Sequence, residues 1–341
     1  MTPPGGGRRP PPRGTRASPP GRGTSSRRAG AGRANAGRAD AGRAGGRGGA
    51  GGRGGAGGRG GGGGRDGAGR SNAGRPHSAE SRGWKKPSAG ELGGDQVEGR
   101  RAVRELLAVG RRPVRRLWMS DGLDSSAQLD EIETLAARRR VRVEMVSRSR
   151  LEAEVRTDAP QGVLALAKPI EPSTLEDLCA SGRGAAPFLL VVSGVTDPRN
   201  LGALLRSAEC AGVTGVVLAR HRAAHLSPTV AKVAAGAIEH LSFAVVGGIP
   251  AALERLSGLG VWTIGLAGEA NRSVYDHPLG DTPVALVVGS EEKGLPPLVR
   301  RRCDEVVAIP QHGSLPSLNV GVAGAVACFE VARQRQVAAS G

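Results

Sequence analysis

The stretch 284–294 reads VALVVGSEEKG and places five consecutive apolar residues directly before a glycine and a charged loop. A run of this kind is typical of a strand that is buried on both faces, as in a parallel sheet covered by helices. Glycine at the end of such a strand lets a ligand approach the backbone closely. The stretch therefore predicts a parallel α/β sheet with a ligand site beyond its carboxyl edge.

Strand-like and helix-like runs alternate on both sides of this stretch. This rhythm favours a mostly parallel sheet with helices on both faces. The predicted strands are 188–192, 215–218, 242–246, 261–266, 284–288 and 305–309, and the predicted helices are 201–211, 229–235, 250–259, 297–302 and 319–336.

A smaller α/β pattern precedes the large one. Its predicted helices are 98–109, 129–139 and 149–155, and its predicted strands are 114–120, 141–146 and 162–167. We assign residues 95–168 to a small α/β domain, 169–186 to a linker with one short helix, and 187–338 to the large domain.

Residues 1–94 form a low-complexity segment rich in glycine and arginine. Residues 1–90 hold 19 Lys and Arg against 3 Asp and Glu, so that nearly all of the chain's net charge of +17 lies there. With few large apolar residues, the segment cannot bury enough surface to offset its chain entropy, and we expect a disordered tail. Such a tail is either a salt-sensitive tether for RNA or a solvated segment without a specific role.

Composition also excludes several classes of protein. The four cysteines, Cys179, Cys210, Cys303 and Cys328, lack the spacing of a zinc site, and we expect reduced, mostly buried thiols in a cytoplasmic protein and no metal. The sequence has no apolar run of the ~18 residues that a membrane span needs, and no apolar stretch typical of a secretory signal at its start.

A first polar loop follows the predicted strand 188–192 and opens a helix. Asp197 or Asn200 can cap that helix. Arg206 lies on a helix otherwise rich in leucine and alanine, where a charge needs a partner or a substrate. A plain N-cap at Asn200 and a salt bridge from Arg206 to Glu209 are the simpler alternatives.

A second and a third loop follow the strands 284–288 and 305–309. Glu291 in the second loop can accept hydrogen bonds, although a charged turn is the simpler interpretation. The order of residues does not match a nucleoside-triphosphate P-loop. In the third loop, Ser317 or Asn319 starts the last helix, which an ordinary helix cap would also explain.

Together, in this order and at strand ends of one α/β domain, the three loops resemble the motifs of the SpoU (TrmH-type) family of RNA ribose 2′-O-methyltransferases, within the SPOUT class. The resemblance covers about residues 97–335. The small domain, with VEGRRAV at 97–103 and QGV at 161–163, resembles the substrate-binding domain of bacterial 23S ribosomal RNA guanosine 2′-O-methyltransferases, which has an L30e/L7Ae-like fold.

The resemblance implies a trefoil-knotted domain that uses S-adenosylmethionine to methylate a ribose 2′-hydroxyl in structured RNA, most simply 23S ribosomal RNA. It also implies a homodimer through the C-terminal helix. The positions that match the catalytic motif residues are Asn200, Arg206, Glu291, Ser317 and Asn319. The positions that match the cofactor-binding residues are Gly289, Ser290, Gly294, Ile309 and Leu318.

The role of Arg206 stays open at this point. The family proposal makes this arginine the proton acceptor, but a guanidinium is effectively always protonated, so that stabilising the developing alkoxide demands less of it. Two other functions also stay open: a methyltransferase acting on transfer RNA, and a non-catalytic protein of the same fold that binds RNA or assists ribosome assembly.

Overall fold

The computed structural model of the chain describes residues 92–180, 186–221, 224–280 and 282–340. Residues 1–91 of the predicted tail 1–94 lie outside the described residues. Its last three positions are packed: Leu92 is buried against the core of the large domain, and the Gly94 N–H donates to the Leu226 carbonyl at 2.8 Å. The folded part of the chain therefore includes Leu92, three residues before the predicted boundary.

The small domain is built on a four-stranded sheet in the order β1-β4-β2-β3, in which only β2 and β3 run parallel. The predicted helix start at Glu98 is wrong, because Glu98 pairs with β4 and Gly99, with φ 93°, turns the chain into α1. The elements are β1 (Gln96–Glu98), α1 (Arg100–Val109), β2 (Val114–Ser120), α2 (Ala127–Arg138), β3 (Val143–Val146), α3 (Arg148–Glu154) and β4 (Val163–Ala167).

The large domain contains a seven-stranded sheet in the order β7-β6-β5-β10-β8-β11-β9, and every neighbouring pair is parallel. This confirms the predicted parallel sheet. The six predicted strands are present, and β9 is too short to leave a sequence pattern. The strands are β5 (Phe188–Val192), β6 (Gly215–Ala219), β7 (Ser242–Val246), β8 (Trp262–Leu266), β9 (Arg272–Ser273), β10 (Val284–Val288) and β11 (Glu305–Ala308).

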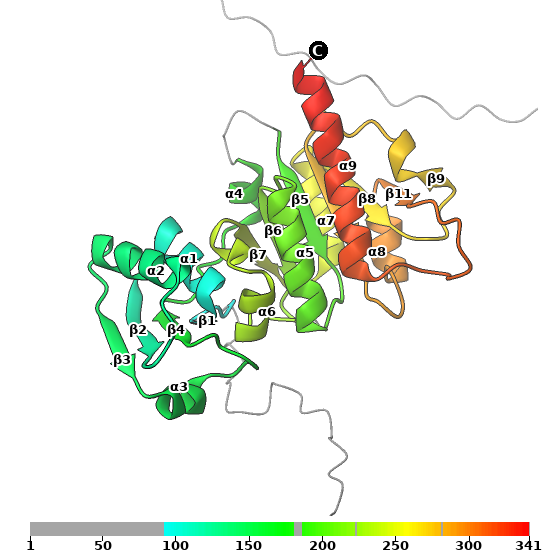
Figure 1. The fold of residues 1–341 in the computed structure, drawn as a ribbon. Coiled ribbons are helices and arrows are strands. Elements are labelled where there is room, and N and C mark those ends of the chain that lie inside the picture. The colour runs from blue at the N-terminus through cyan, green and yellow to red at the C-terminus, as the bar shows by residue number, and fades with distance from the viewer. Residues whose placement is uncertain (1–91, 181–185, 222–223, 281, 341) are drawn as a thin grey trace, which may run out of the picture. The chain divides into compact units, whose positions relative to one another are not determined.

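Helices cover both faces of this sheet (Figure 1). One core cluster joins α5, α6, η1 and α9 to the sheet, and the other joins α4, α7 and α8 to its opposite face. No helix among the described residues combines the length and apolar character that crossing a membrane requires. The helices are α4 (Leu175–Cys179), α5 (Pro198–Cys210), α6 (Pro228–Val233), η1 (Ala237–Glu239), α7 (Ile249–Gly258), η2 (Val274–Asp276), α8 (Pro297–Arg302) and α9 (Val320–Ser340).

Small residues let α9 pack closely on α5, which lies beside it in Figure 1. A Cβ atom placed on Gly324 would come within 2.3 Å of the Leu204 side chain. The small residues of the last helix therefore serve a contact within the chain. Its apolar side chains Val322 and Phe329 remain about half exposed, at 51% and 50%.

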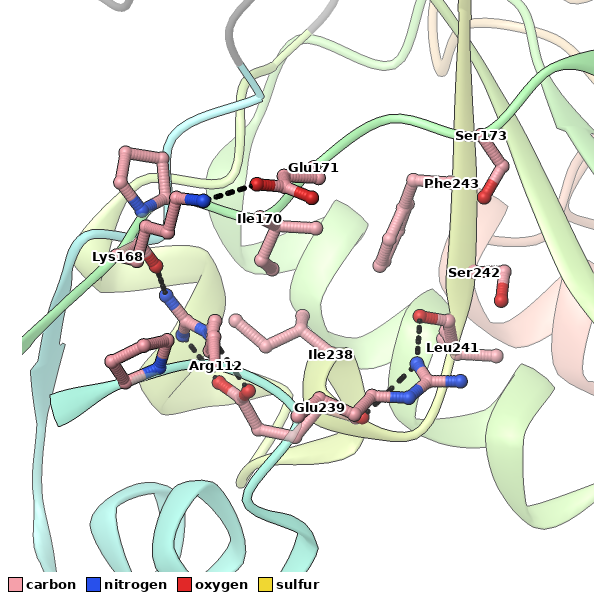
Figure 2. A pocket seen from close by; sticks show the side chains of 13 residues that line it. Arg112, Lys168, Ile170, Glu171, Ser173, Ile238, Glu239, Leu241, Ser242 and Phe243 are labelled. Carbon is pink, nitrogen blue, oxygen red and sulfur yellow. Dashed lines mark hydrogen bonds and ion pairs between the residues drawn. The ribbon is translucent and has the colours of Figure 1, made fainter.

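A buried ion pair joins the small domain to the large one (Figure 2). The Arg112 guanidinium donates to the Glu239 carboxylate through Nη2 at 2.5 Å and Nε at 3.0 Å, and the two side chains are only 7% and 2% exposed. Its Nη1 donates to the carbonyl groups of Gly94 and Lys168, each at 2.6 Å. One arginine thus connects the segment before β1, the segment after β4 and the 3-10 helix η1. We call this group the Arg112 clamp.

Candidate functional site

The three polar loops converge at the carboxyl edge of the large sheet, and one motif residue from each loop takes part in a hydrogen-bonded chain. The Asn200 side-chain amide donates from Nδ2 to Glu291 Oε1 at 2.8 Å. The Asn319 amide in turn donates from Nδ2 to Asn200 Oδ1 at 2.9 Å. Three residues that are 91 and 119 positions apart therefore meet, because β5 and β10 are neighbours and α9 packs on α5.

Helix capping explains only part of this arrangement. Asp197 caps α5 by accepting from the Arg199 N–H at 2.9 Å, so that Asn200 is not needed as a cap. Asn319 does cap α9, since its Oδ1 accepts from the Gly321 N–H at 2.9 Å. Its Nδ2 donates to Asn200 at the same time, so that capping α9 does not exclude the contact with Asn200.

A cavity of about 470 Å³ lies beside this chain of side chains, which is within the usual range for small-molecule sites. The predicted cofactor residues all line it, as do Glu291 and Ser317. The lining includes Gly289, Ser290, Glu291, Gly294, Ile309, Ser317 and Leu318.

The glycine loop after β10 is shaped by backbone contacts. Ser290 and Gly294 exchange two backbone hydrogen bonds of 3.0 Å, which close the loop. A Cβ atom on Gly289 would lie 2.1 Å from the Gly294 carbonyl carbon, so that only glycine fits there. The cavity combines this backbone cradle with apolar side chains such as Leu295 and Val320, and with the carboxylate of Glu291. Such a lining suits a nucleoside that carries a positive charge, and S-adenosylmethionine is one.

Arg206 does not line this cavity. It lies exposed six residues beyond Asn200, about 9 Å along α5 at ~1.5 Å per residue. It lines a second depression together with Arg101, Arg104 and His240. The alternative of an ion pair with Glu209 is not realised, because Arg206 has no hydrogen-bond or ion-pair partner within the described ranges.

The loop that follows β8 was not predicted as part of the site. Gly268 and Glu269 line the cavity, and Glu269 is ion-paired with Arg300. The available signal was their position directly after a buried strand of the same parallel sheet, where ligands of this fold class bind. The segment AGE carried no motif that would have separated it from an ordinary turn.

Within the part of the chain that the structure describes, no group of His, Cys, Asp and Glu could hold a metal ion. The four cysteines are free, as expected. The expectation that most are buried is wrong: Cys328 is buried, Cys179 and Cys303 are half-buried, and Cys210 is exposed, since it ends α5. Burial raises the pKa of the Cys328 thiol to about 12, which keeps it protonated.

Comparisons with known proteins agree with this geometry. The model of the SpoU rRNA Methylase family matches residues 187–329, and the model described as RNA 2′-O ribose methyltransferase substrate binding matches residues 96–173. The chain is 39% identical over 246 residues to the 23S rRNA (guanosine-2′-O-)-methyltransferase RlmB of Pseudomonas putida, which covers 71% of this chain and 98% of that protein.

Solved structures share the fold. The SpoU methyltransferase AviRb of Streptomyces viridochromogenes in complex with AdoMet has a TM-score of 0.60 and 24% identity, over 71% of this chain and 90% of that one. A second crystal structure, of an RNA 2′-O ribose methyltransferase, has a TM-score of 0.57 and 26% identity, over 71% of this chain and 88% of that one.

Proposed function

The chain belongs to the SpoU rRNA methylase family, and on that premise we propose that it methylates the ribose 2′-hydroxyl of a guanosine in 23S ribosomal RNA with S-adenosylmethionine as the methyl donor. The observation that carries the proposal is the hydrogen-bonded chain Asn319–Asn200–Glu291, of which Glu291 lines the cavity. The named target of the Pseudomonas putida relative supports guanosine in 23S ribosomal RNA.

The protein's part in this reaction is alignment and charge. S-adenosylmethionine supplies a methyl group on a sulfonium sulfur, already activated for transfer. The backbone around Gly289, Ile309 and Leu318 holds the cofactor. The amides of Asn200 and Asn319, which are linked to the cavity through Glu291, position the ribose. Alignment of this kind lowers a barrier by roughly 7–11 kcal/mol. Arg206 contacts the RNA and stabilises the charge that develops on the attacking oxygen.

Arg206→Ala tests this division of roles. We expect an unchanged affinity for S-adenosylmethionine, because Arg206 lies outside the cavity, and a loss of about 100-fold in methylation, since loss of one transition-state donor typically costs this much. Calorimetry with the cofactor and methyl transfer to RNA measure the two quantities. Full activity, or a parallel loss of cofactor affinity, contradicts the assignment.

The target itself is tested in cells. Ribosomal and transfer RNA from cells with and without the protein are digested, and mass spectrometry identifies the 2′-O-methylnucleoside that disappears. Loss of a methylguanosine from 23S ribosomal RNA is expected. Loss from transfer RNA alone would favour the transfer RNA alternative, and no loss despite cofactor binding would favour a non-catalytic role. We propose a cytoplasmic location, with which action on ribosomal RNA is compatible.

The domain boundaries and the knot of the large domain are part of the same proposal. We assign residues 95–168 to an L30e-like RNA-binding domain, 169–186 to the linker and 187–338 to a trefoil-knotted methyltransferase domain. The return of the chain from β11 across β8 and β10 to pack α9 on α5 supports the knot. A crystal structure traced through 289–319 tests the threading. Of the predicted disordered tail 1–94, residues 1–91 lie outside the described residues, and their disorder stays a prediction from composition.

We also propose a homodimer through α9. The exposed side chains Val322, Phe329 and Val337 fall within about 80° of one another around this helix, which makes a mostly apolar stripe that Arg333, ion-paired with Glu330, interrupts. Phe329→Glu places a charge in that stripe and is expected to give monomers by light scattering, with reduced methylation. Leu298→Glu, at a similarly exposed site on α8, is the control and should leave the mass unchanged. If the Phe329→Glu variant is still a dimer, the interface does not involve this side of α9.

A further inference from the structure

Two arginine side chains of the small domain stack against one tryptophan. The indole of Trp118 is 4% exposed, and the guanidinium carbons of Arg116 and Arg150 lie 5.3 Å and 4.9 Å from its ring centroid. The indole N–H donates to Glu144 Oε2 at 3.0 Å, which fixes the orientation of the ring. We call Arg116, Trp118 and Arg150 the arginine platform.

The fold explains how these side chains meet. Arg116 and Trp118 are two residues apart in β2 and therefore share one face of the small sheet. α3 covers part of that face through Leu151, which packs in a small cluster with Trp118, and this contact brings Arg150 to the ring. The other face of the same sheet packs against α1 and α2. The platform thus lies on the face that the helices leave partly open.

The charges of the platform are not neutralised within the described residues. Arg116 and Arg150 are exposed, and neither has an ion-pair partner there. Arg148, two positions before Arg150, differs in this respect, because it is paired with Glu152 at 2.8 Å. The two guanidinium groups share one ring and lie at most about 10 Å apart, so that both charges can act on one bound anion, most strongly at low salt.

Stacking on the ring leaves the planar N–H edge of each guanidinium available. Cation–π contact contributes ~0.5–1 kcal/mol at exposed sites, so that it orients the two guanidinium groups without neutralising their charge. A guanidinium fork held in one plane matches the oxygen atoms of a phosphate, and it loses little entropy on binding because it is already oriented. An anion that spans both forks would be attracted by both charges.

We propose that the arginine platform binds backbone phosphates of the RNA substrate, as a second contact separate from the methylation cavity. The inference rests on the proposed function, which supplies RNA as the partner. The platform anchors RNA through charge and shape, and it takes no part in methyl transfer. Its loss therefore acts on RNA affinity, while cofactor affinity and the rate at saturating RNA stay the same.

The experiment uses the full chain and an unmodified transcript of 23S ribosomal RNA, with the dissociation constant measured at several salt concentrations. Arg116→Gln and Arg150→Gln are each expected to weaken binding about threefold to tenfold and to lower the slope of log Kd against log salt by ~0.7–0.9, the value for one phosphate contact. Arg148→Gln removes a charge from the same helix, but one already paired, and serves as the matched control. It should change neither quantity appreciably.

Further measurements separate the possible outcomes. Arg116→Lys keeps the charge without the planar fork and is expected to restore the salt slope but only part of the affinity. Equal affinity and slope in wild type and both glutamine variants would overturn the proposal, and so would an equal loss in Arg148→Gln. A lower melting temperature with unchanged RNA affinity would leave only a stacking role, which also overturns it. Failure of the proposed function is a distinct result, in which the wild-type chain binds the transcript and transfers no methyl group.

Discussion

Gly289→Ala is expected to weaken S-adenosylmethionine binding by about 1,000-fold or more, roughly 4 kcal/mol, and to abolish methylation with it. The new methyl group would lie 2.1 Å from the Gly294 carbonyl carbon and 2.4 Å from the Leu295 nitrogen, which are backbone atoms with no free rotation to escape. The loop must therefore move, which breaks the two hydrogen bonds between Ser290 and Gly294. Overpacking costs ~1–3 kcal/mol and each lost hydrogen bond about 1 kcal/mol.

Calorimetry with the cofactor measures this effect directly. Gly247→Ala is the matched control, since Gly247 is exposed and a Cβ atom there meets nothing within 4 Å. The control should bind the cofactor as wild type does. If Gly289→Ala binds S-adenosylmethionine within a few-fold of wild type, the loop after β10 does not form the cofactor cradle.

Arg112→Leu is expected to lower the free energy of unfolding by about 3–5 kcal/mol, because it leaves the Glu239 carboxylate buried without its partner. The same change removes the donors for the Gly94 and Lys168 carbonyl groups. Urea denaturation measures the loss. Arg148→Leu breaks an exposed ion pair of the same domain and should cost less than about 1 kcal/mol.

A double variant tests the physical reason. Arg112→Leu with Glu239→Leu removes both charges and should recover part of the lost stability, since two buried apolar residues avoid an unpaired charge. Recovery stays incomplete because the two carbonyl groups still lack donors. A double variant as unstable as the sum of the two single variants would mean that the side chains do not interact through their charges.

Most of the fold followed from periodicity. The run of apolar residues at Val284–Val288 predicted a strand buried on both faces, and it forms β10, the middle strand of the seven, between β5 and β8. Helix α5 starts at Pro198, three residues before the predicted start, because Asp197, one of the two predicted caps, is the residue that caps it. β1 escaped prediction because three residues carry no measurable alternation, and its pairing with β4 alone defines it.

The candidate site was predicted in part. Asn200, Glu291 and Asn319 meet as the motifs implied, and the five predicted cofactor positions line one cavity. Their roles in catalysis stay predictions. The position of Arg206 outside that cavity could not be read from the sequence. Residues three to four apart share a helix face and residues six apart do not, but which face meets the ligand depends on how α5 packs.

The sequence alone determined three features, because each depends only on neighbours along the chain. They are the order of the apolar runs of the strands, the glycine at the end of β10 and the charge of residues 1–90. The meeting of Asn200 with Asn319, the Arg112 clamp and the arginine platform were decided by the tertiary structure. Periodicity specifies which side of an element is buried, but not which distant element covers it. That choice belongs to the packing of the whole domain, where residues more than a hundred positions apart satisfy one another's hydrogen bonds and charges.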